Sequence, residues 1–220
     1  MPIRAVIFDF GGVILTSPFE AFARCERDRG LPDGFLRRLN ATNPDTNAWS
    51  RRERNDVDLA GFVSLFEAEA RAAGHEIDGQ AVMGMLVGEV RPQMLEGLRR
   101  CHDRLKTALL TNNFVLEDAA GAAGAAGAAG QANPQGPMAE VIDLLDVVVE
   151  SSKVGMRKPD TAIYELVCTE LGVAPSEAVF LDDLGVNLKP ARAMGMTTIK
   201  VADPDQALAE LERVVGFALR

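Results

Sequence analysis

Hydrophobic positions along the chain form short continuous runs, separated by longer stretches with helical spacing. The first run, Ile3–Phe10 (IRAVIFDF), is almost entirely apolar, which is typical of a strand covered on both faces of a parallel sheet. Later runs predict further strands at Thr107–Leu110, Ala178–Leu181, Val147–Glu150 and Thr197–Val201.

Helical spacing fills the intervals between these runs, for example at Ala162–Leu171 and Gln206–Val215. Alternating strands and helices predict an α/β fold, a doubly wound, Rossmann-like parallel sheet. Ligands bind beyond the carboxyl ends of the strands in such sheets. Polar residues follow the runs at these ends, so we expect the functional site there.

Residues 17–90 have a different pattern. They are rich in Arg, Glu, Ala and Leu, lack a strong strand run, and show helical spacing around Phe19–Arg29, Leu59–Ala73 and Gln80–Glu89. We interpret residues 17–90 as a helical cap inserted into a core made of residues 1–16 and 91–220.

A low-complexity stretch lies within the predicted core. Ala favours helix and Gly opposes it, so the repeat AAGAAGAAGAAG at Ala119–Gly130 has no decisive conformational preference. We predict a flexible segment over residues 119–137. Because it follows one of the polar clusters, a loop that moves over the site is the alternative.

The composition narrows the function classes. A net charge of -9 argues against nucleic acid or an anionic membrane as the main partner, although local donors or a metal still allow phosphate binding. The 3 cysteines form no CxxC pair, which argues against zinc and a disulfide framework and favours the cytoplasm. The N-terminal run carries Arg4 and Asp9 and is interpreted as a strand rather than a signal peptide, and no apolar run reaches membrane-spanning length.

Asp9 is the first candidate for chemistry. It ends the first predicted strand and precedes Gly11-Gly12, where the backbone can approach a ligand closely. A carboxylate there can attack phosphorus and form an acyl-phosphate. An aspartate that only caps a turn is the alternative.

Two further segments carry groups suited to phosphate. Thr111 and Asn112 offer a hydroxyl and an amide after the second predicted strand, or alternatively cap the next helix. Lys158 precedes Pro159, which favours an extended conformation at the lysine. Its ammonium group could neutralise a nucleophile and a phosphoryl group, or alternatively lie at the surface.

Asp182 and Asp183 close another predicted strand, with Asn187 shortly after. Adjacent acids at the end of a buried strand repel each other without a cation. Mg²⁺ prefers hard oxygen ligands and needs few from protein, so Asp9 and one of this pair would suffice. Such an ion lowers the repulsion between an anionic nucleophile and an anionic substrate.

These segments occur in an order and spacing that resemble the haloacid dehalogenase superfamily over essentially the whole chain. The likeness is greatest to the N-terminal phosphatase domain of soluble epoxide hydrolases and the related domain of acyl-CoA dehydrogenase family proteins. The segments that carry it are Val6–Leu15, Leu109–Asn113, Ser151–Asp160 and Phe180–Met196.

The resemblance implies a helical cap, a small phosphorylated substrate and a role for each matching residue. Asp9 is similar to the nucleophile and metal ligand, and Asp183 to the direct metal ligand. The family also takes a metal ligand from the backbone carbonyl at the position of Gly11. The remaining implied roles are phosphate holding by Thr111, Asn112 and Lys158, the catalytic lysine at Lys158, and support of the metal ligands by Asp182 and Asn187.

Gly11 departs from the family pattern, in which most phosphatases place a general acid/base aspartate at this position. Losing such a group typically costs ~10²–10⁴-fold in rate. The sequence therefore predicts slow hydrolysis that is least impaired for good leaving groups.

Two other functions stay open at this point. Gly11 favours a catalytically weak binding module, and Asp9 could attack carbon in a haloacid dehalogenase, although that chemistry does not need the Asp182-Asp183 pair. Oligomeric state is not predicted. Candidates in the cap for reaching the site, with a solvated surface as the favoured alternative, are Trp49, Arg51, Arg52, Glu53, Arg54 and Asn55.

Overall fold

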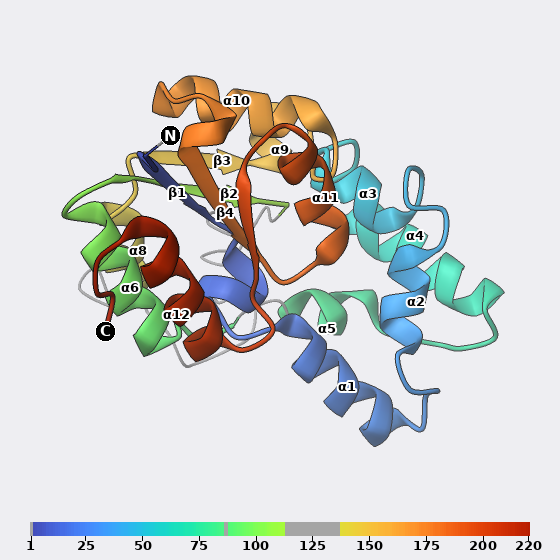
Figure 1. Cartoon of the computed structure of the whole chain (residues 1–220). Coiled ribbons are helices and arrows are strands. Elements are labelled where there is room, and N and C mark those ends of the chain that lie inside the picture. The colour runs from blue at the N-terminus through green and yellow to red at the C-terminus, as the bar shows by residue number, and fades with distance from the viewer. Residues whose placement is uncertain (1, 86–87, 113–136) are drawn as a thin grey trace.

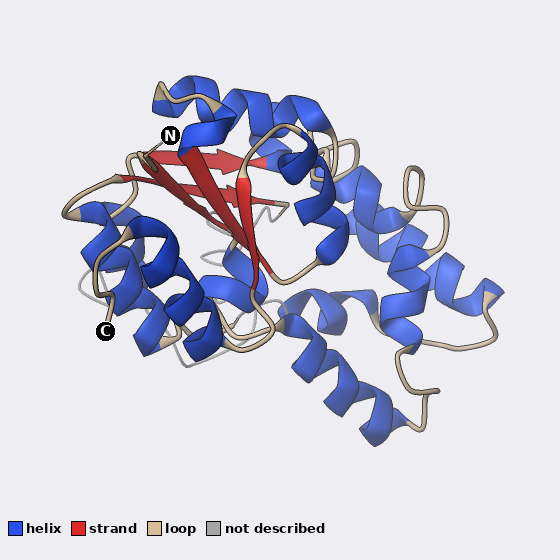
Figure 2. Cartoon of the chain, viewed as in Figure 1, coloured by secondary structure: helices blue, strands red, loops and turns tan. Residues whose placement is uncertain are grey.

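The computed structural model describes residues 2–85, 88–112 and 137–220, and a five-stranded parallel sheet organises them (Figures 1 and 2). The strand order is β3-β2-β1-β4-β5. The strands are β1 (Ala5–Phe8), β2 (Lys106–Thr111), β3 (Val147–Glu150), β4 (Ala178–Asp182) and β5 (Thr197–Lys200). The doubly wound α/β fold predicted from the apolar runs is confirmed, and no strand extends more than one residue beyond either end of the run that predicted it.

Helices cover both faces of the sheet. One face carries α6 (Pro92–His102), α8 (Pro137–Asp143) and α12 (Pro204–Val215), and the other carries α10 (Thr161–Leu171) and α11 (Gly185–Ala193). The short elements α9 (Ser151–Val154) and η2 (Pro175–Glu177) join strands to these helices. None of the helices in the described ranges is long and apolar enough to cross a membrane.

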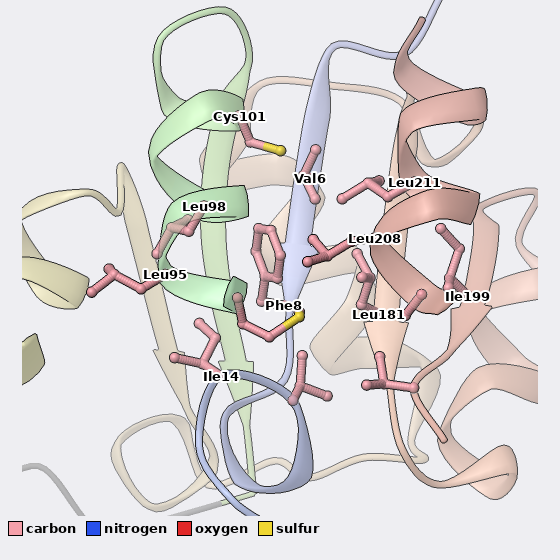
Figure 3. Close-up of a cluster of buried hydrophobic side chains, with 14 of the residues drawn as sticks. Val6, Phe8, Ile14, Leu95, Leu98, Cys101, Leu181, Ile199, Leu208 and Leu211 are labelled. Carbon is pink, nitrogen blue, oxygen red and sulfur yellow. The ribbon is translucent and has the colours of Figure 1, made fainter. Parts of the chain in front are cut away.

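Strand β1 lies at the centre of the sheet and contributes to two hydrophobic clusters. Val6 and Phe8 face α6 and α12, where Leu98 and Leu208 pack against them (Figure 3). Ala5 and Ile7 face the opposite cluster. Alternation of side chains along a fully buried strand explains why this run is apolar at every position.

The chain leaves β1 at a sharp turn, and residues 18–84 then form helices only. These are α1 (Pro18–Arg29), α2 (Phe35–Ala41), α3 (Ala48–Glu53), α4 (Leu59–Ala72) and α5 (Gly79–Gly84), which lie together at one side of the sheet (Figure 1). Their apolar side chains form a separate cluster around Phe62 and Phe66. We call residues 17–90 the helical insert, a division from the core that stays a prediction.

Some details of the insert differ from the sequence prediction. Helices α2 and α3 were not predicted, because each is about two turns or less and shows little periodicity. The helix predicted at Gln80–Glu89 ends at Gly84. The predicted flexible segment lies outside the described residues over 119–136, and Pro137 begins α8.

Both ends of the insert meet beside the sheet. Leu15 and Val90 form an antiparallel bridge, the Thr16 N–H donates to the Glu89 carbonyl at 2.9 Å, and the Arg91 N–H donates to the Ile14 carbonyl at 2.9 Å. The segment that enters the insert is therefore hydrogen-bonded to the segment that leaves it, at the point where both join the core.

The turn after β1, η1 (Phe10–Ile14), depends on a glycine. Gly12 has φ +80°, a conformation that costs little only for residues without a Cβ. A Cβ built on Gly12 would lie 2.5 Å from Asp183 Oδ2. The turn after β1 and the loop after β4 thus approach each other more closely than any side chain at position 12 allows.

We predict that Gly12→Ala destabilises the fold by about 1–3 kcal/mol through backbone strain, with a further loss from the contact with Asp183. Urea denaturation measures the change. Gly216→Ala is the matched control, because Gly216 has φ +81° and nothing lies within 4 Å of its added Cβ. Equal losses in the two variants would show that Asp183 does not restrict position 12.

Candidate functional site

Asp9 lies at the carboxyl end of the central strand. Its N–H donates to the Leu181 carbonyl at 2.9 Å, which continues the pairing of β1 with β4, and its side chain is buried with 7% of the residue exposed. One carboxylate oxygen, Oδ1, accepts from the Phe10 N–H at 2.7 Å. Asp9 is thus fixed by the central strand at the carboxyl end of the sheet, which is where ligands bind in folds of this type.

The neighbouring strand β4 brings two more carboxylates to Asp9. Asp182 ends this strand and Asp183 follows it. Carboxylate oxygens of Asp9, Asp182 and Asp183 all lie within 4.8 Å of one another. The structure therefore brings together carboxylates from two separate strands, β1 and β4.

Lys158 brings a positive charge into this acidic cluster. Its Nζ lies 2.8 Å from Asp9 Oδ1 and 2.7 Å from Asp182 Oδ2, and only 1% of its side chain is exposed. The ammonium group also lies 5.4 Å from the centre of the Phe180 ring. Burial of Lys158 excludes the surface position that was the alternative for this residue.

Asp182 has both carboxylate oxygens engaged by protein groups. Its Oδ1 accepts from the Leu184 N–H at 2.7 Å, its Oδ2 accepts from Lys158, and the Asn187 amide donates to both oxygens at 3.1 and 3.0 Å. The Tyr164 hydroxyl in turn donates to the Asn187 carbonyl at 2.8 Å. Asp182 is thereby held in place by Leu184 in the loop after β4, Lys158 in the loop before α10, and Asn187 on α11.

The donor set fits a divalent cation. The cluster contains three carboxylates and one ammonium group, which contacts two of them, so the fully ionised cluster is left with an excess of two negative charges. All of the nearby ligand atoms are hard oxygens, the type that Mg²⁺ and Ca²⁺ bind. A cation bound here would offset the repulsion between these closely spaced carboxylates.

The pKa values of these acids reflect their burial first and their mutual repulsion second. Burial raises the pKa of Asp9 well above its usual range, against the lowering effect of Lys158, and the charges of Asp182 and Asp183 raise it further. Burial, and then the charge of Asp182, raise the pKa of Asp183 to about 6. Burial lowers the pKa of Lys158, but Asp182 and Asp9 outweigh it, so the net pKa is raised. Additional positive charge nearby would lower the pKa values of both acids and so favour their ionised forms.

Thr111 is the last residue of strand β2, the other neighbour of β1, and Asn112 comes directly after it. Thr111 is buried at the end of the strand. The Asn112 side chain contacts the backbone of Lys158: its Nδ2 donates to the Lys158 carbonyl at 2.8 Å, and its Oδ1 accepts from the Lys158 N–H at 2.7 Å. The amide predicted to hold phosphate is therefore engaged in holding the lysine segment.

Gly11 begins the turn beyond Asp9 with φ -68° and ψ 128°. This is extended backbone that any residue adopts, unlike that of Gly12. No conformational constraint requires a glycine at position 11.

Among the cap candidates, Glu53 contacts the core. Its Oε2 lies 2.7 Å from Nε of Arg157, the residue before Lys158. Trp49 packs inside the insert, 4.9 Å from the Phe62 ring centre, and Arg54 donates to the Asp45 carbonyl within the insert at 2.7 Å. These contacts of Trp49 and Arg54 are thus made within the insert and not with the acidic cluster.

Sequence reasoning missed several residues that support the site, namely Arg157, Tyr164 and Phe180. The single Tyr of the chain lies on an apolar helix face, which indicates a buried hydroxyl that needs a partner. Sequence carries no comparable signal for Arg157, because its neighbours do not indicate which way it points.

The sequence profile of the haloacid dehalogenase-like hydrolase family matches residues 3–195. The chain is 33% identical to mouse acyl-CoA dehydrogenase family member 10, over 98% of this chain and 19% of that protein. It is 32% identical to pig bifunctional epoxide hydrolase 2, over 100% of this chain and 40% of that protein. The chain thus spans less than half the length of these two relatives.

A third relative has a similar length. The sesquiterpene phosphatase astK of Aspergillus oryzae is 26% identical over 97% of both chains. Among solved structures, a HAD family enzyme from Bacteroides thetaiotaomicron in complex with magnesium and inorganic phosphate aligns with a TM-score of 0.59, at 18% identity over 90% of this chain and 93% of that one. At this identity the structural likeness shows the fold. The profile match and the relatives together confirm the predicted resemblance: the chain belongs to the haloacid dehalogenase-like hydrolase family.

Proposed function

We propose that the protein is a magnesium-dependent phosphomonoester hydrolase that acts on a small phosphorylated metabolite through an aspartyl-phosphate at Asp9. The observation that carries this proposal is the shared cluster of Asp9, Asp182, Asp183 and Lys158, with carboxylate oxygens within 4.8 Å of one another and the ammonium 2.8 Å from Asp9. An anionic nucleophile can meet an anionic substrate only where positive charge is available between them.

The residues that would hold Mg²⁺ are Asp9, Asp183 and the backbone carbonyl of Gly11, with Asp182 and Asn187 supporting them. Bound there, the ion supplies positive charge that fixes the phosphate and lowers the repulsion between phosphate and nucleophile. The hard oxygens and the negative excess of the cluster support this assignment.

The remaining chemistry belongs to the protein's own side chains. One Asp9 oxygen attacks phosphorus in line, the bond to the leaving-group oxygen breaks, and an acyl-phosphate forms. Water then attacks the acyl-phosphate, which releases inorganic phosphate and regenerates the carboxylate. The Lys158 ammonium offsets charge on the transferring group, and Thr111 and Asn112 hold its nonbridging oxygens. Because the Asn112 side chain is bonded to Lys158, its backbone N–H is the group we assign to phosphate.

The comparisons support phosphate as the ligand. One relative of matching length is named a phosphatase, and one solved structure of the same fold holds magnesium and inorganic phosphate. A reducing compartment such as the cytoplasm suits the three cysteines Cys25, Cys101 and Cys168, which are buried free thiols.

We predict that p-nitrophenyl phosphate is hydrolysed only with Mg²⁺ and that Asp9→Asn reduces hydrolysis to the uncatalysed rate, because the amide is a poor nucleophile. Phosphate release measures both effects. Asp205→Asn is the matched control, since Asp205 is exposed on α12. Absence of metal-dependent hydrolysis would favour the binding module, and chloride release from a haloacid would favour the dehalogenase.

We also predict that Gly11→Asp accelerates hydrolysis of esters with poor leaving groups, up to the ~10²–10⁴-fold that a positioned acid/base supplies. The gain should be smaller for p-nitrophenyl phosphate, whose leaving group needs little protonation. The backbone at Gly11, with φ -68°, accepts an aspartate without strain.

A series of alkyl and aryl phosphates measures this dependence on the leaving group. Gly84→Asp adds the same charge at a glycine in α5 where nothing lies within 4 Å of a new Cβ. If Gly11→Asp leaves the rates on good and poor leaving groups unchanged, the missing aspartate does not limit turnover.

A further inference from the structure

An ion pair joins the helical insert to the segment that carries Lys158. Arg157 Nε lies 2.7 Å from Glu53 Oε2 at the end of α3, and 18% and 15% of the two side chains are exposed. Arg157 Nη1 also donates to the Pro44 carbonyl at 2.8 Å, in the loop before α3. One core guanidinium thus contacts two parts of the insert.

A helix–helix contact lies beside the ion pair between Glu53 and Arg157. Helix α3 packs against α9, which ends just before the Arg157 segment. Figure 1 shows α3 as the part of the insert nearest to α9 and α11. The insert therefore contacts the core close to the loop that holds the lysine.

Arg157 is covalently adjacent to Lys158, so their Cα atoms are about 3.8 Å apart across a trans peptide. Both backbone polar groups of Lys158 are bonded to the Asn112 side chain, and its Nζ contacts Asp9 and Asp182. Adjacent residues are thus anchored to different parts of the protein, Arg157 to the insert and Lys158 to the acidic cluster. Because one peptide unit joins them, the placement of Arg157 restricts the placement of the Lys158 ammonium.

We propose that Glu53 and Arg157 are positioning residues, whose ion pair couples the placement of the helical insert to the placement of the Lys158 ammonium between Asp9 and Asp182. The role of Lys158 in this statement rests on the proposed function. The pair itself is a contact between insert and core that does not depend on it.

The electrostatics of Glu53 argue against a purely stabilising role. Burial raises the pKa of Glu53 to about 7, against the lowering effects of Arg157, Lys158 and Arg54, the charged groups that face it. Because this pKa lies above the usual value, the folded state binds a proton more tightly than the unfolded state. Stability therefore falls as the pH rises toward 7, where the ion pair forms. A partly buried charge pair kept at a cost in stability is suited to specifying geometry.

Steady-state kinetics on p-nitrophenyl phosphate with Mg²⁺ test the proposal in the whole 220-residue chain. At pH 8.5 we predict that Glu53→Gln and Arg157→Gln each lower kcat by about tenfold to a hundredfold, with a smaller change in KM, because each substitution removes one charge of the ion pair. The double variant should be no worse than either single variant. Arg157→Lys should retain more activity than Arg157→Gln.

The pH dependence separates positioning from folding. Glu53→Gln resembles protonated Glu53, so the ratio of wild-type to variant kcat should fall toward one below about pH 6. Arg4→Gln is the control, because Arg4 pairs with Glu177 at 3.1 Å beside the amino ends of β1 and β4. A pH-independent ratio, or equal losses in the control, would overturn the proposal.

Hydrogen exchange tests the pair without activity. The Lys158 N–H is bonded to Asn112 Oδ1 at 2.7 Å, and the Asp160 N–H donates to the Arg157 carbonyl at 2.9 Å. We expect faster exchange of these two amides in Glu53→Gln and Arg157→Gln but not in Arg4→Gln. Unchanged exchange would contradict the proposal. If the wild type lacks phosphatase activity, the proposed function fails, and exchange alone then decides whether the pair positions Lys158.

Discussion

The burial of several negative charges at one edge of the sheet is the constraint on which the rest of the structure depends. Asp9, Asp182 and Asp183 approach within 4.8 Å, and burial raises the pKa of Asp9 and of Asp183. Charges in this arrangement are tolerated only where they are paired and hydrogen-bonded. Lys158 and the Asn187 amide meet part of this requirement, and the excess negative charge explains why we assign a cation to the same place.

Residues from several strands and helices hold the side chains of this cluster in place. Asn112 holds the lysine backbone from β2, Tyr164 holds the carbonyl of Asn187 from α10, and the glycine at position 12 leaves room for Asp183. Each of these contacts joins a different strand or helix to the same few side chains. The site is therefore a property of the sheet, the loops that follow its strands, and helices α10 and α11, rather than of any single loop.

Much of this arrangement was predictable from the sequence, because parallel strands end at a common edge. Continuous apolar runs marked the strands to within a few residues, and the polar residues after them marked the site. What sequence reasoning missed depends on tertiary geometry. The short helix that carries Glu53 has too few turns for a periodic signal, and nothing next to Asn112 indicates that its amide would bond to the Lys158 backbone 46 residues away.

The bridge between Leu15 and Val90 has a consequence for how such proteins diversify. Since the excursion through the helices starts and finishes at neighbouring points, its length and sequence can change without shifting the register of any strand. A donor segment from another protein could be spliced in at these two residues, giving chimaeras that share one α/β sheet and differ only in the helices inserted after β1.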